Sequence, residues 1–565
     1  METRNQIGVI RILAFCASST TLAMTPEINF DPFNWIKLTI AIALTASASF
    51  IFFFSRKQEK KGKIDLLSFG TCTFLAMALL SFFINQNMSE NFWGTPGRAT
   101  GLAYTVLISL IFLIGAKLDL FLSREIIFRS LRITGDIFIC YVTLQFLDLD
   151  PVNWTVNQTF GFMGNLNFSS AFLGMYAVAE LRGFLNIPSS QKTRISSGTR
   201  ILLSTFYIWD SGSLQGILMF SLAMSLILIL RHGKQLWKKP KFTYLATFSV
   251  FLFCTGTILL MAQKSFLNGI IFQETLGYRL DYWKAGLKMW THSLFIGIGS
   301  GEFGSYYREY RAASSIFPDV DRTSNSAHSI IVEILAGQGL FVGTIYLSAV
   351  ILVAIAGLRF TIRSNNDYVF VTYALWLALQ IQLVIGIGQV SLGVWNSIFA
   401  GMLVSGIMRP ERLTPGLRAR KSHGSQNDQL GLSTRSILRE TSMTNSSHFL
   451  GSLGLIFGLL VASPMLISDA QYQTFQKQSD FSRMESIANR PFVSIYYKER
   501  TLERYVQQSD YENSNRLAIE IAREYPRSFY AWKVLALMPE GGEGTRNEAK
   551  ARLRTLDPHN QSWNE

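Results

Sequence analysis

The residues best suited to chemistry lie in one polar, aromatic and glycine-rich stretch, residues 279–343, between long apolar runs. Two side chains in it have the clearest chemical use. Arg279 carries a guanidinium, whose planar fork matches the oxygens of a phosphate. His328 opens a long apolar segment, where the positive end of a helix dipole disfavours imidazolium, so a neutral ring can accept a proton. The pair predicts a site that holds an anion and assists a proton transfer.

Other residues of the stretch are suited to surround a substrate. Tyrosine rings interleaved with guanidinium groups suit sugars and phosphates, and glycines allow a tight backbone whose N–H groups can face an anion. The binding candidates are Trp283, Gly299, Gly301, Tyr307, Arg308 and Arg311. The structural alternatives are an arginine that pairs with lipid headgroups, Asp281 or Glu274, and rings that only anchor the loop at the membrane surface.

Three common kinds of site are not indicated. Residues 299–304 match the G-x-G-x-x-G pattern of dinucleotide sites, but no strand–helix–strand unit surrounds them. The four cysteines lie in apolar segments without a C-x-x-C pair. We therefore expect no disulfide framework, no metal site and no cofactor.

The composition predicts a polytopic membrane protein. Of the 565 residues, 49% are hydrophobic and only 16% are charged, whereas soluble proteins carry about 25% charge. Strands are not expected, because open sheet edges are not tolerated in hydrocarbon. We expect an all-α fold with about 12–13 transmembrane helices of ~20 residues. The expected spans are residues 7–24, 35–54, 64–84, 99–116, 131–147, 161–181, 200–210 (the short arm of a hairpin), 213–230, 242–262, 328–358, 367–388, 391–408 and 448–468.

The distribution of basic residues indicates which side of the membrane each loop faces. The net charge is +14, and lysines and arginines cluster in the short connections between alternate apolar runs, whereas the opposite short loops carry only Arg98. Cytoplasmic loops are the ones enriched in basic residues. We expect a multi-pass plasma or inner membrane protein with a cytoplasmic N-terminus and an extracytoplasmic C-terminal tail. The same placement argues against a nucleic-acid partner.

The polarity profile divides the chain into four parts. Residues 1–408 form a membrane domain, which contains an extracytoplasmic catalytic loop at 263–327; a disordered cytoplasmic linker (409–447), a final transmembrane helix (448–468) and an extracytoplasmic helical tail (469–565) follow. Apolar residues at helical spacing mark three helix faces in the tail. Paired short helices of this kind resemble a tetratricopeptide-type repeat, whose alternative is an ordinary helical cap on the membrane domain.

The order and spacing of the loop residues resemble the O-antigen ligase / O-antigen polymerase family. The residues that carry the resemblance are Arg279-x3-Trp283, Gly297-x-Gly299-x-Gly301-x-Phe303, Tyr307, Ala327-His328-x4-Glu333, Gly339 and Gly343. The resemblance implies inverting, metal-independent transfer of a glycan from polyprenyl diphosphate to an acceptor hydroxyl on the outer face of the membrane. Arg279 would bind the diphosphate, His328 would activate the acceptor, and Glu333 would help bind substrate. The choice between ligase and polymerase stays open, as does the acceptor, which would be a glycan, a lipid or a protein.

Two departures from the family pattern concern donor binding. The family often has Ser-Arg-Gly at the tip of an earlier hairpin, where this chain has Ser213-Leu214-Gln215-Gly216. Gln215 offers a neutral hydrogen bond but no charge. Either Arg98, Arg308 or Arg311 replaces the missing guanidinium, or this chain binds its donor differently. The family's usual Asn after the histidine is Ser329 here.

Two other classes of function compete with glycan transfer. A transporter or flippase of lipid-linked glycans would carry ionisable residues along facing spans and would show repeat symmetry. The few candidates are Arg11, Asp136 and Glu180, and no inverted repeat is evident. The other class is a non-catalytic assembly protein that gathers protein partners through its C-terminal helices.

Overall fold

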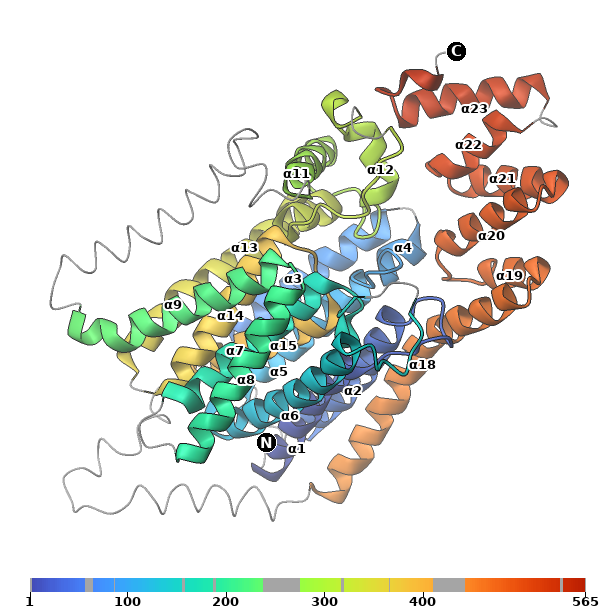
Figure 1. Cartoon of the computed structure of the whole chain (residues 1–565). Helices are drawn as coiled ribbons and strands as arrows, with labels where there is room; N and C mark the ends of the chain where they lie inside the picture. The colour runs from blue at the N-terminus through green and yellow to red at the C-terminus, as the bar shows by residue number, and fades with distance from the viewer. Residues whose placement is uncertain are drawn as a thin grey trace, which may run out of the picture.

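The computed structural model describes residues 3–55, 65–85, 87–154, 158–185, 190–236, 275–316, 320–364, 366–409, 443–538 and 542–563. Within these ranges all regular secondary structure is helical. Figure 1 shows a bundle of long helices with a column of short helices at one end. The expectation of an all-α fold is therefore confirmed for this part of the chain.

Twelve of the described helices build the bundle. They are α1 (Thr3–Leu22), α2 (Asn34–Phe54), α3 (Leu66–Ile84), α5 (Leu102–Lys117), α6 (Leu120–Phe146), α7 (Leu166–Leu185), α8 (Gln191–Asp210), α9 (Leu214–Leu236), α13 (Ile330–Arg363), α14 (Asp367–Ile385), α15 (Val390–Met408) and α18 (Asn445–Lys477). Among the described helices, six are long and apolar enough to cross a membrane, namely α2, α3, α13, α14, α15 and α18. The expected span at 242–262 and almost all of the linker expected at 409–447 lie outside the described residues.

Helix α15 lies in the core of the bundle. Its Trp395 is fully buried, and the indole N–H donates to the Thr21 hydroxyl of α1 at 3.0 Å. By contrast, α3 and α13 leave most of their apolar surface uncovered. An apolar helix exposed in this way suits contact with lipid, because hydrocarbon is as apolar as the side chains that face it.

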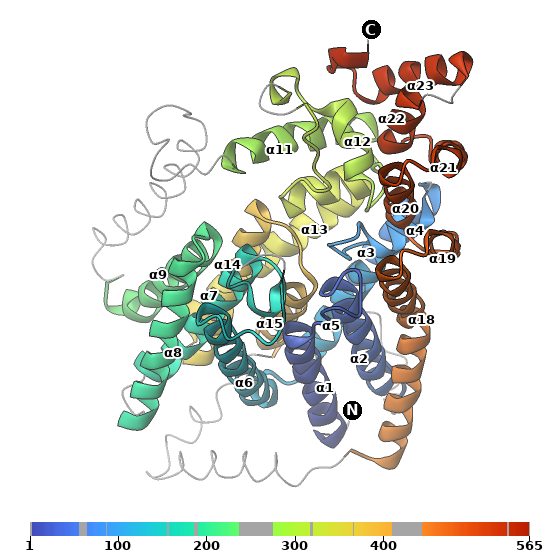
Figure 2. The ribbon, with the colours of Figure 1, turned by 45° about the vertical axis from the view of Figure 1, so that its right-hand side comes forward.

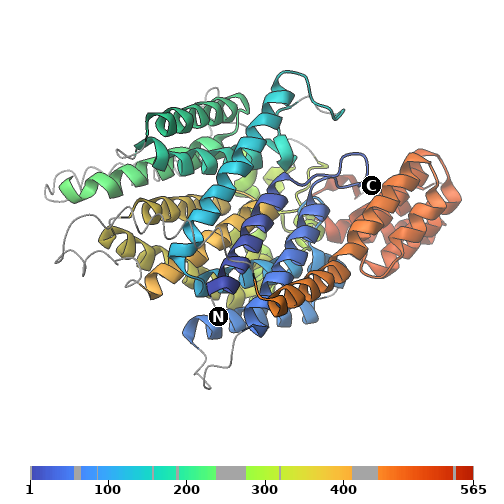
Figure 3. The ribbon, with the colours of Figure 1, turned by 90° about the horizontal axis from the view of Figure 1, so that it is seen from below.

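Small residues let the bundle helices approach closely. On α18, a Cβ at Gly458 would lie 2.6 Å from the Ala43 Cα of α2. On α15, a Cβ at Gly401 would lie 2.8 Å from the Gly115 Cα of α5. Such contacts give membrane helices van der Waals packing where the hydrophobic effect drives no association. Figure 3 shows α18 beside α2 at the edge of the bundle, leading into the C-terminal helices.

Several bundle helices are longer than the spans expected from the sequence, and α8 and α18 are two of them. α8 begins at Gln191, so the hairpin has a full first arm instead of the short one expected at 200–210. α18 continues to Lys477, past the expected end at residue 468. Both extensions are rich in polar residues, which continue a helix outside hydrocarbon but give no apolar signal in the sequence.

The C-terminal tail is a column of five helices. They are α19 (Phe481–Ala488), α20 (Ile495–Gln507), α21 (Tyr511–Glu524), α22 (Phe529–Leu537) and α23 (Glu543–Leu556). Each packs on the next, and Leu517, Trp532 and Leu553 of the three expected faces are buried between them. Figure 2 shows this column at the end of the bundle away from the N-terminus, beside α4 (Met88–Trp93) and α12 (Phe303–Tyr310).

Candidate functional site

A glycine kink fixes the start of α13 against the preceding loop. Gly339 has a φ of 80° inside this helix, a conformation that is strained for a residue with a side chain. A Cβ there would lie 2.3 Å from the carbonyl carbon of Phe295. One turn earlier, the Ile298 N–H donates to the Ala336 carbonyl at 2.8 Å. The loop and the first turns of α13 are therefore joined through their backbones.

Gly299 and Gly301 serve close packing. The Gly299 N–H donates to the Gly337 carbonyl at 2.9 Å, so it is not free for an anion as the sequence suggested. A Cβ at Gly301 would lie 2.3 Å from the carbonyl oxygen of Glu90 on α4. Only a residue without a side chain lets these two backbones approach so closely.

Glu333 builds the turn that presents His328. Its Oε2 accepts the Ala327 N–H at 2.7 Å and the Ser326 hydroxyl at 3.0 Å, and Ser326 Oγ in turn accepts the His328 N–H at 3.1 Å. His328 has a φ of 53° and lies just before α13. The N-cap residue, Ser329, makes no capping hydrogen bond through its side chain. Glu333 thus reaches back from the first turn of the helix and holds the backbone that precedes the N-cap.

The imidazole of His328 is neutral at pH 7. Burial lowers its pKa to about 3, and the nearby guanidiniums of Arg98 and Arg279 lower it further in the same direction. The neutral ring predicted from the helix dipole is found, but its causes are desolvation and these two charges. Its ring centre lies 5.4 Å from that of Tyr282, with the planes tilted by 31°.

Arg279 reaches the site from α11 (Thr275–His292). Its Nη1 donates to the Ile385 carbonyl at the end of α14, at 2.7 Å. A helix C-terminus carries partial negative charge, which suits a cation. Burial lowers the pKa of Arg279, but an arginine stays charged at pH 7. Within the described ranges no carboxylate pairs with it, and one carbonyl leaves most of its N–H donors available.

Gln215 meets the same end of α14. It lies at the start of α9 and is buried, and its Oε1 accepts an N–H of Gln382 at 3.3 Å. Its Nε2 lies 3.4 Å from the position of a Cβ on Gly386, the residue after Ile385. The hairpin tip and Arg279 are therefore linked through one turn of α14.

Arg98 supplies a second guanidinium beside His328. It lies between α4 and α5, and its Nη2 donates to Asn325 Oδ1 at 2.9 Å, three residues before the histidine. Its charge is among those that lower the pKa of His328. Of the three arginines named as possible replacements for the missing guanidinium, Arg98 is thus the one whose charge acts on the imidazole.

Residues 199–347 match a family model described as O-antigen ligase. This chain carries an O-antigen ligase domain. The match runs from α8 into α13 and includes Gln215, Arg279, His328 and Glu333, which agrees with the resemblance read from the loop. Arg98 lies outside the match. No curated protein matches the chain.

Arg308 and Arg311 of the ligase domain bind the C-terminal tail. Arg311 Nη2 donates to Asp557 Oδ2 at 2.6 Å, and both side chains are 0% exposed. Arg308 Nη1 lies 3.4 Å from the same oxygen, and its Cζ lies 4.1 Å from the Phe529 ring centre. The Arg311 guanidinium is therefore fully engaged by the tail, whereas the Arg308 side chain is 13% exposed. That these arginines bind a substrate stays a prediction.

Two aromatic residues of the ligase domain form a contact chain to His328: Tyr307 contacts Tyr282, whose ring lies against the imidazole. Tyr307 is fully buried, and its ring contacts that of Tyr282 edge-on at 5.4 Å. Trp283 is half-buried, and within the described part of the chain its indole N–H has no acceptor. Tyr282 was not among the predicted site residues, although its position one turn after Arg279 places it on the same face of α11.

Proposed function

We propose that this protein transfers a glycan from a polyprenyl diphosphate carrier to an acceptor hydroxyl at the outer face of the membrane. The O-antigen ligase domain and the apolar helices fit a membrane glycan ligase or polymerase. The proposal is supported by one observation: His328 is a buried, neutral imidazole whose pKa is lowered further by the charges of Arg98 and Arg279. The acceptor would be a glycan, a lipid or a protein, and the product a surface polysaccharide.

Arg98 and Arg279 would hold the diphosphate. Their N–H forks match its oxygens, and a buried guanidinium is stabilised when an anion joins it. In the transfer step the bond between the anomeric carbon and the phosphate oxygen breaks, and its electron pair stays with the diphosphate. The two guanidiniums stabilise that added negative charge, which lowers the barrier. Gln215 would position Arg279 through the end of α14.

His328 would accept the proton of the acceptor hydroxyl as its oxygen attacks the anomeric carbon. With no donor bound, its pKa of about 3 makes the ring a weak base at pH 7. A bound diphosphate opposes the charges of Arg98 and Arg279 and so raises this pKa. The base would become effective only with donor in place.

Complementation of a strain lacking the protein tests this function. The intact chain is compared with Arg98→Ala, Arg279→Ala and His328→Ala by the size distribution of surface polysaccharide. We expect each variant to lose long polysaccharide while lipid-linked glycan accumulates on the outer face. The loss for His328→Ala should be at least about 100-fold, the range for a positioned acid–base group. His292→Ala is the matched control, because this histidine ends α11 and its ring contacts that of Tyr310 at 5.7 Å.

The same experiment separates transfer from its competitors. A normal size distribution in all three variants would remove the site, provided that the proteins are present in the membrane. Glycan accumulating on the inner face would instead indicate a transporter. The two acidic residues noted for transport are engaged in ion pairs, Asp136 with Arg200 and Glu180 with Arg132, each at 2.7 Å. No observation favours that alternative.

A further inference from the structure

A second pair of arginines lies at the other end of the bundle from the ligase site. Helix α14 begins there at Asp367 and ends at the site with Ile385. Arg124 is near the start of α6, and Arg182 is in the last turn of α7. The excess of basic residues in the neighbouring loops makes this the expected cytoplasmic end.

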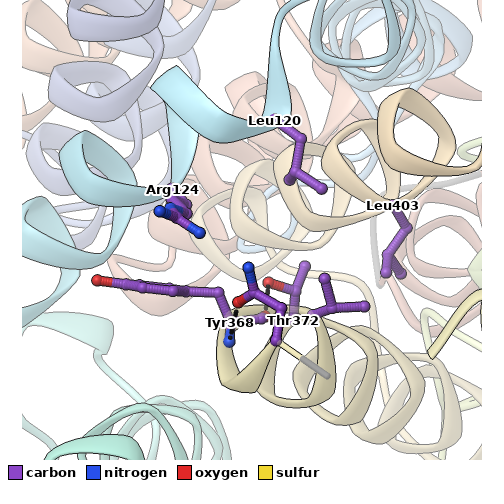
Figure 4. Close-up of a pocket in the computed structure, with 7 residues that line it drawn as sticks. Leu120, Arg124, Tyr368, Thr372 and Leu403 are labelled. Carbon is purple, nitrogen blue, oxygen red and sulfur yellow. Dashed lines mark hydrogen bonds between the residues drawn. The ribbon is translucent and has the colours of Figure 1, made fainter. Parts of the chain in front are cut away.

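Both guanidiniums stack on one aromatic ring. The Cζ of Arg124 lies 4.8 Å from the ring centre of Tyr368, and the Cζ of Arg182 lies 4.1 Å from the same centre. Arg124 also lies 4.1 Å from the ring centre of Phe121. Figure 4 shows Arg124 above the Tyr368 ring. A stacked guanidinium is held in place while its in-plane N–H groups stay available for hydrogen bonds.

Neither guanidinium has an acceptor within the described ranges. The Nε of Arg124 is buried and has no hydrogen-bond partner, and Arg182 forms neither a hydrogen bond nor an ion pair there. The acidic side chains beside them are used elsewhere. Glu125 accepts the Tyr368 hydroxyl at 2.7 Å, and Asp119 caps the N-terminus of α6. Buried or half-buried charges are costly without a partner, so this pair calls for an anion.

We propose that Arg124 and Arg182 bind the phosphate of an anionic membrane lipid. The cavity beside Arg124 measures about 10 Å³, and Leu120, Val369 and Leu403 line it together with the polar residues Arg124, Asn366, Tyr368 and Thr372. It has room for one water at most, so the phosphate would lie on its rim. In other membrane proteins, basic pockets between helices on the cytoplasmic side bind the headgroups of anionic lipids.

Lipid binding to the purified full-length chain in neutral detergent tests this site. Thermal unfolding and titration are run with dioleoylphosphatidylglycerol, and with dioleoylphosphatidylcholine as the lipid without net charge. We expect phosphatidylglycerol to raise the Tm of the intact protein. Arg124→Gln and Arg182→Gln should each weaken its apparent affinity about tenfold. Arg129→Gln is the control, because Arg129 is an exposed arginine on the same helix.

The possible outcomes decide the proposal. Arg124→Lys keeps the charge but loses the planar fork, so it should bind lipid more weakly even if Arg124→Gln fails to fold. Equal affinity of the intact protein and Arg182→Gln would overturn the site, and so would an equal response to phosphatidylcholine. If inorganic phosphate or pyrophosphate alone gives the same rise in Tm, the ligand is a free anion and the lipid assignment is wrong.

Discussion

At the scale of single residues, Glu90 joins the bundle to the tail. This carboxylate belongs to α4, yet its Oε1 accepts the Ser494 hydroxyl at 2.6 Å and the Ile495 N–H at 2.8 Å at the start of α20. Its other oxygen is buried without a hydrogen-bond partner in the described residues. Burial, and then the nearby charge of Glu302, raise the pKa of Glu90 to about 7.

This carboxyl should make the stability of the protein pH-dependent. Its ordinary pKa is 4.5 and its pKa in the folded protein is about 7, so between these values the folded state keeps a proton that the unfolded state loses. The stabilisation is complete below about pH 4.5 and is lost as the pH rises through 7. We expect the Tm to fall between about pH 5 and pH 7.5. Glu90→Gln should flatten this fall, because an amide does not titrate in this pH range. Its oxygen can still accept both hydrogen bonds.

Thermal unfolding of both proteins across this pH range makes the comparison. Glu503→Gln, in the interior of α20, is the control, since Glu503 forms a partly exposed pair with Arg500. Parallel Tm curves for the intact protein and Glu90→Gln would show that this carboxyl is not the group that titrates.

The residues of the site could be predicted only in part. Arg279 and His328 stood out because an arginine and a helix-opening histidine are unusual beside apolar runs, and the structure brings them together. The sequence named Arg98 as one of three compensating arginines, but only the packing of α4 against the loop separates it from Arg308 and Arg311. The partner of Arg311 lies 246 residues further along the chain. No local pattern reports a contact between residues so far apart.

At the scale of elements, the kink in α13 sets where the loop runs. The helix is continuous on both sides of Gly339, and the positive φ at this residue turns its first segment toward the loop. The Leu340 N–H then donates to the Leu294 carbonyl at 2.9 Å. The kink therefore replaces a hydrogen bond within the helix by one to the loop that leads to the site.

A side chain at Gly339 should disrupt this junction. In Gly339→Ala the Cβ would lie 2.3 Å from the Phe295 carbonyl carbon, and the backbone would be held at an unfavourable φ. We expect a loss of about 2 kcal/mol or more in the free energy of unfolding, together with reduced transfer. Gly70→Ala on α3 is the matched control, because nothing lies within 4 Å of its added Cβ. It should change stability by about 1 kcal/mol or less.

Thermal unfolding and polysaccharide size distribution are measured for both variants. If Gly339→Ala is as stable and as active as Gly70→Ala, the kink does not position the site.

The sequence offered Gly339 only as part of a family pattern, since a single glycine in an apolar run has no characteristic signal. The apolar runs themselves were predictable, because a span of hydrocarbon demands them. The polar ends of α8 and α18 could not be predicted, because polar residues give no apolar signal in the sequence.

At the scale of the whole molecule, the tail contacts two elements that lie near the site, α4 and α12. It meets α4, next to Arg98, through Glu90, and it meets α12 through the buried pair of Arg311 and Asp557. Arg527 adds an ion pair with Glu309 on the same side of α12. The helical tail was predictable from its periodicity, but its docking was not, because no local pattern marks Asp557 as the partner of Arg311.

Removing Asp557 should loosen this docking. In Asp557→Ala the guanidinium of Arg311 would stay buried without its carboxylate, which costs about 3–5 kcal/mol. We expect faster hydrogen exchange in α12 and α23 and a reduced rate of transfer. Glu503→Ala removes a partly exposed partner of Arg500 and should cost about 1 kcal/mol or less. Unchanged exchange in α12 would mean that the tail does not brace the loop.

The long separation of Arg311 and Asp557 in the chain also orders events during synthesis. Arg311 leaves the ribosome 246 residues before Asp557, which at ~5–20 residues per second corresponds to about 12–50 seconds. Until then the guanidinium has no carboxylate to meet and stays hydrated. The newly made enzyme would thus insert its membrane helices first and gain a closed outer loop only later, so that maturation follows insertion.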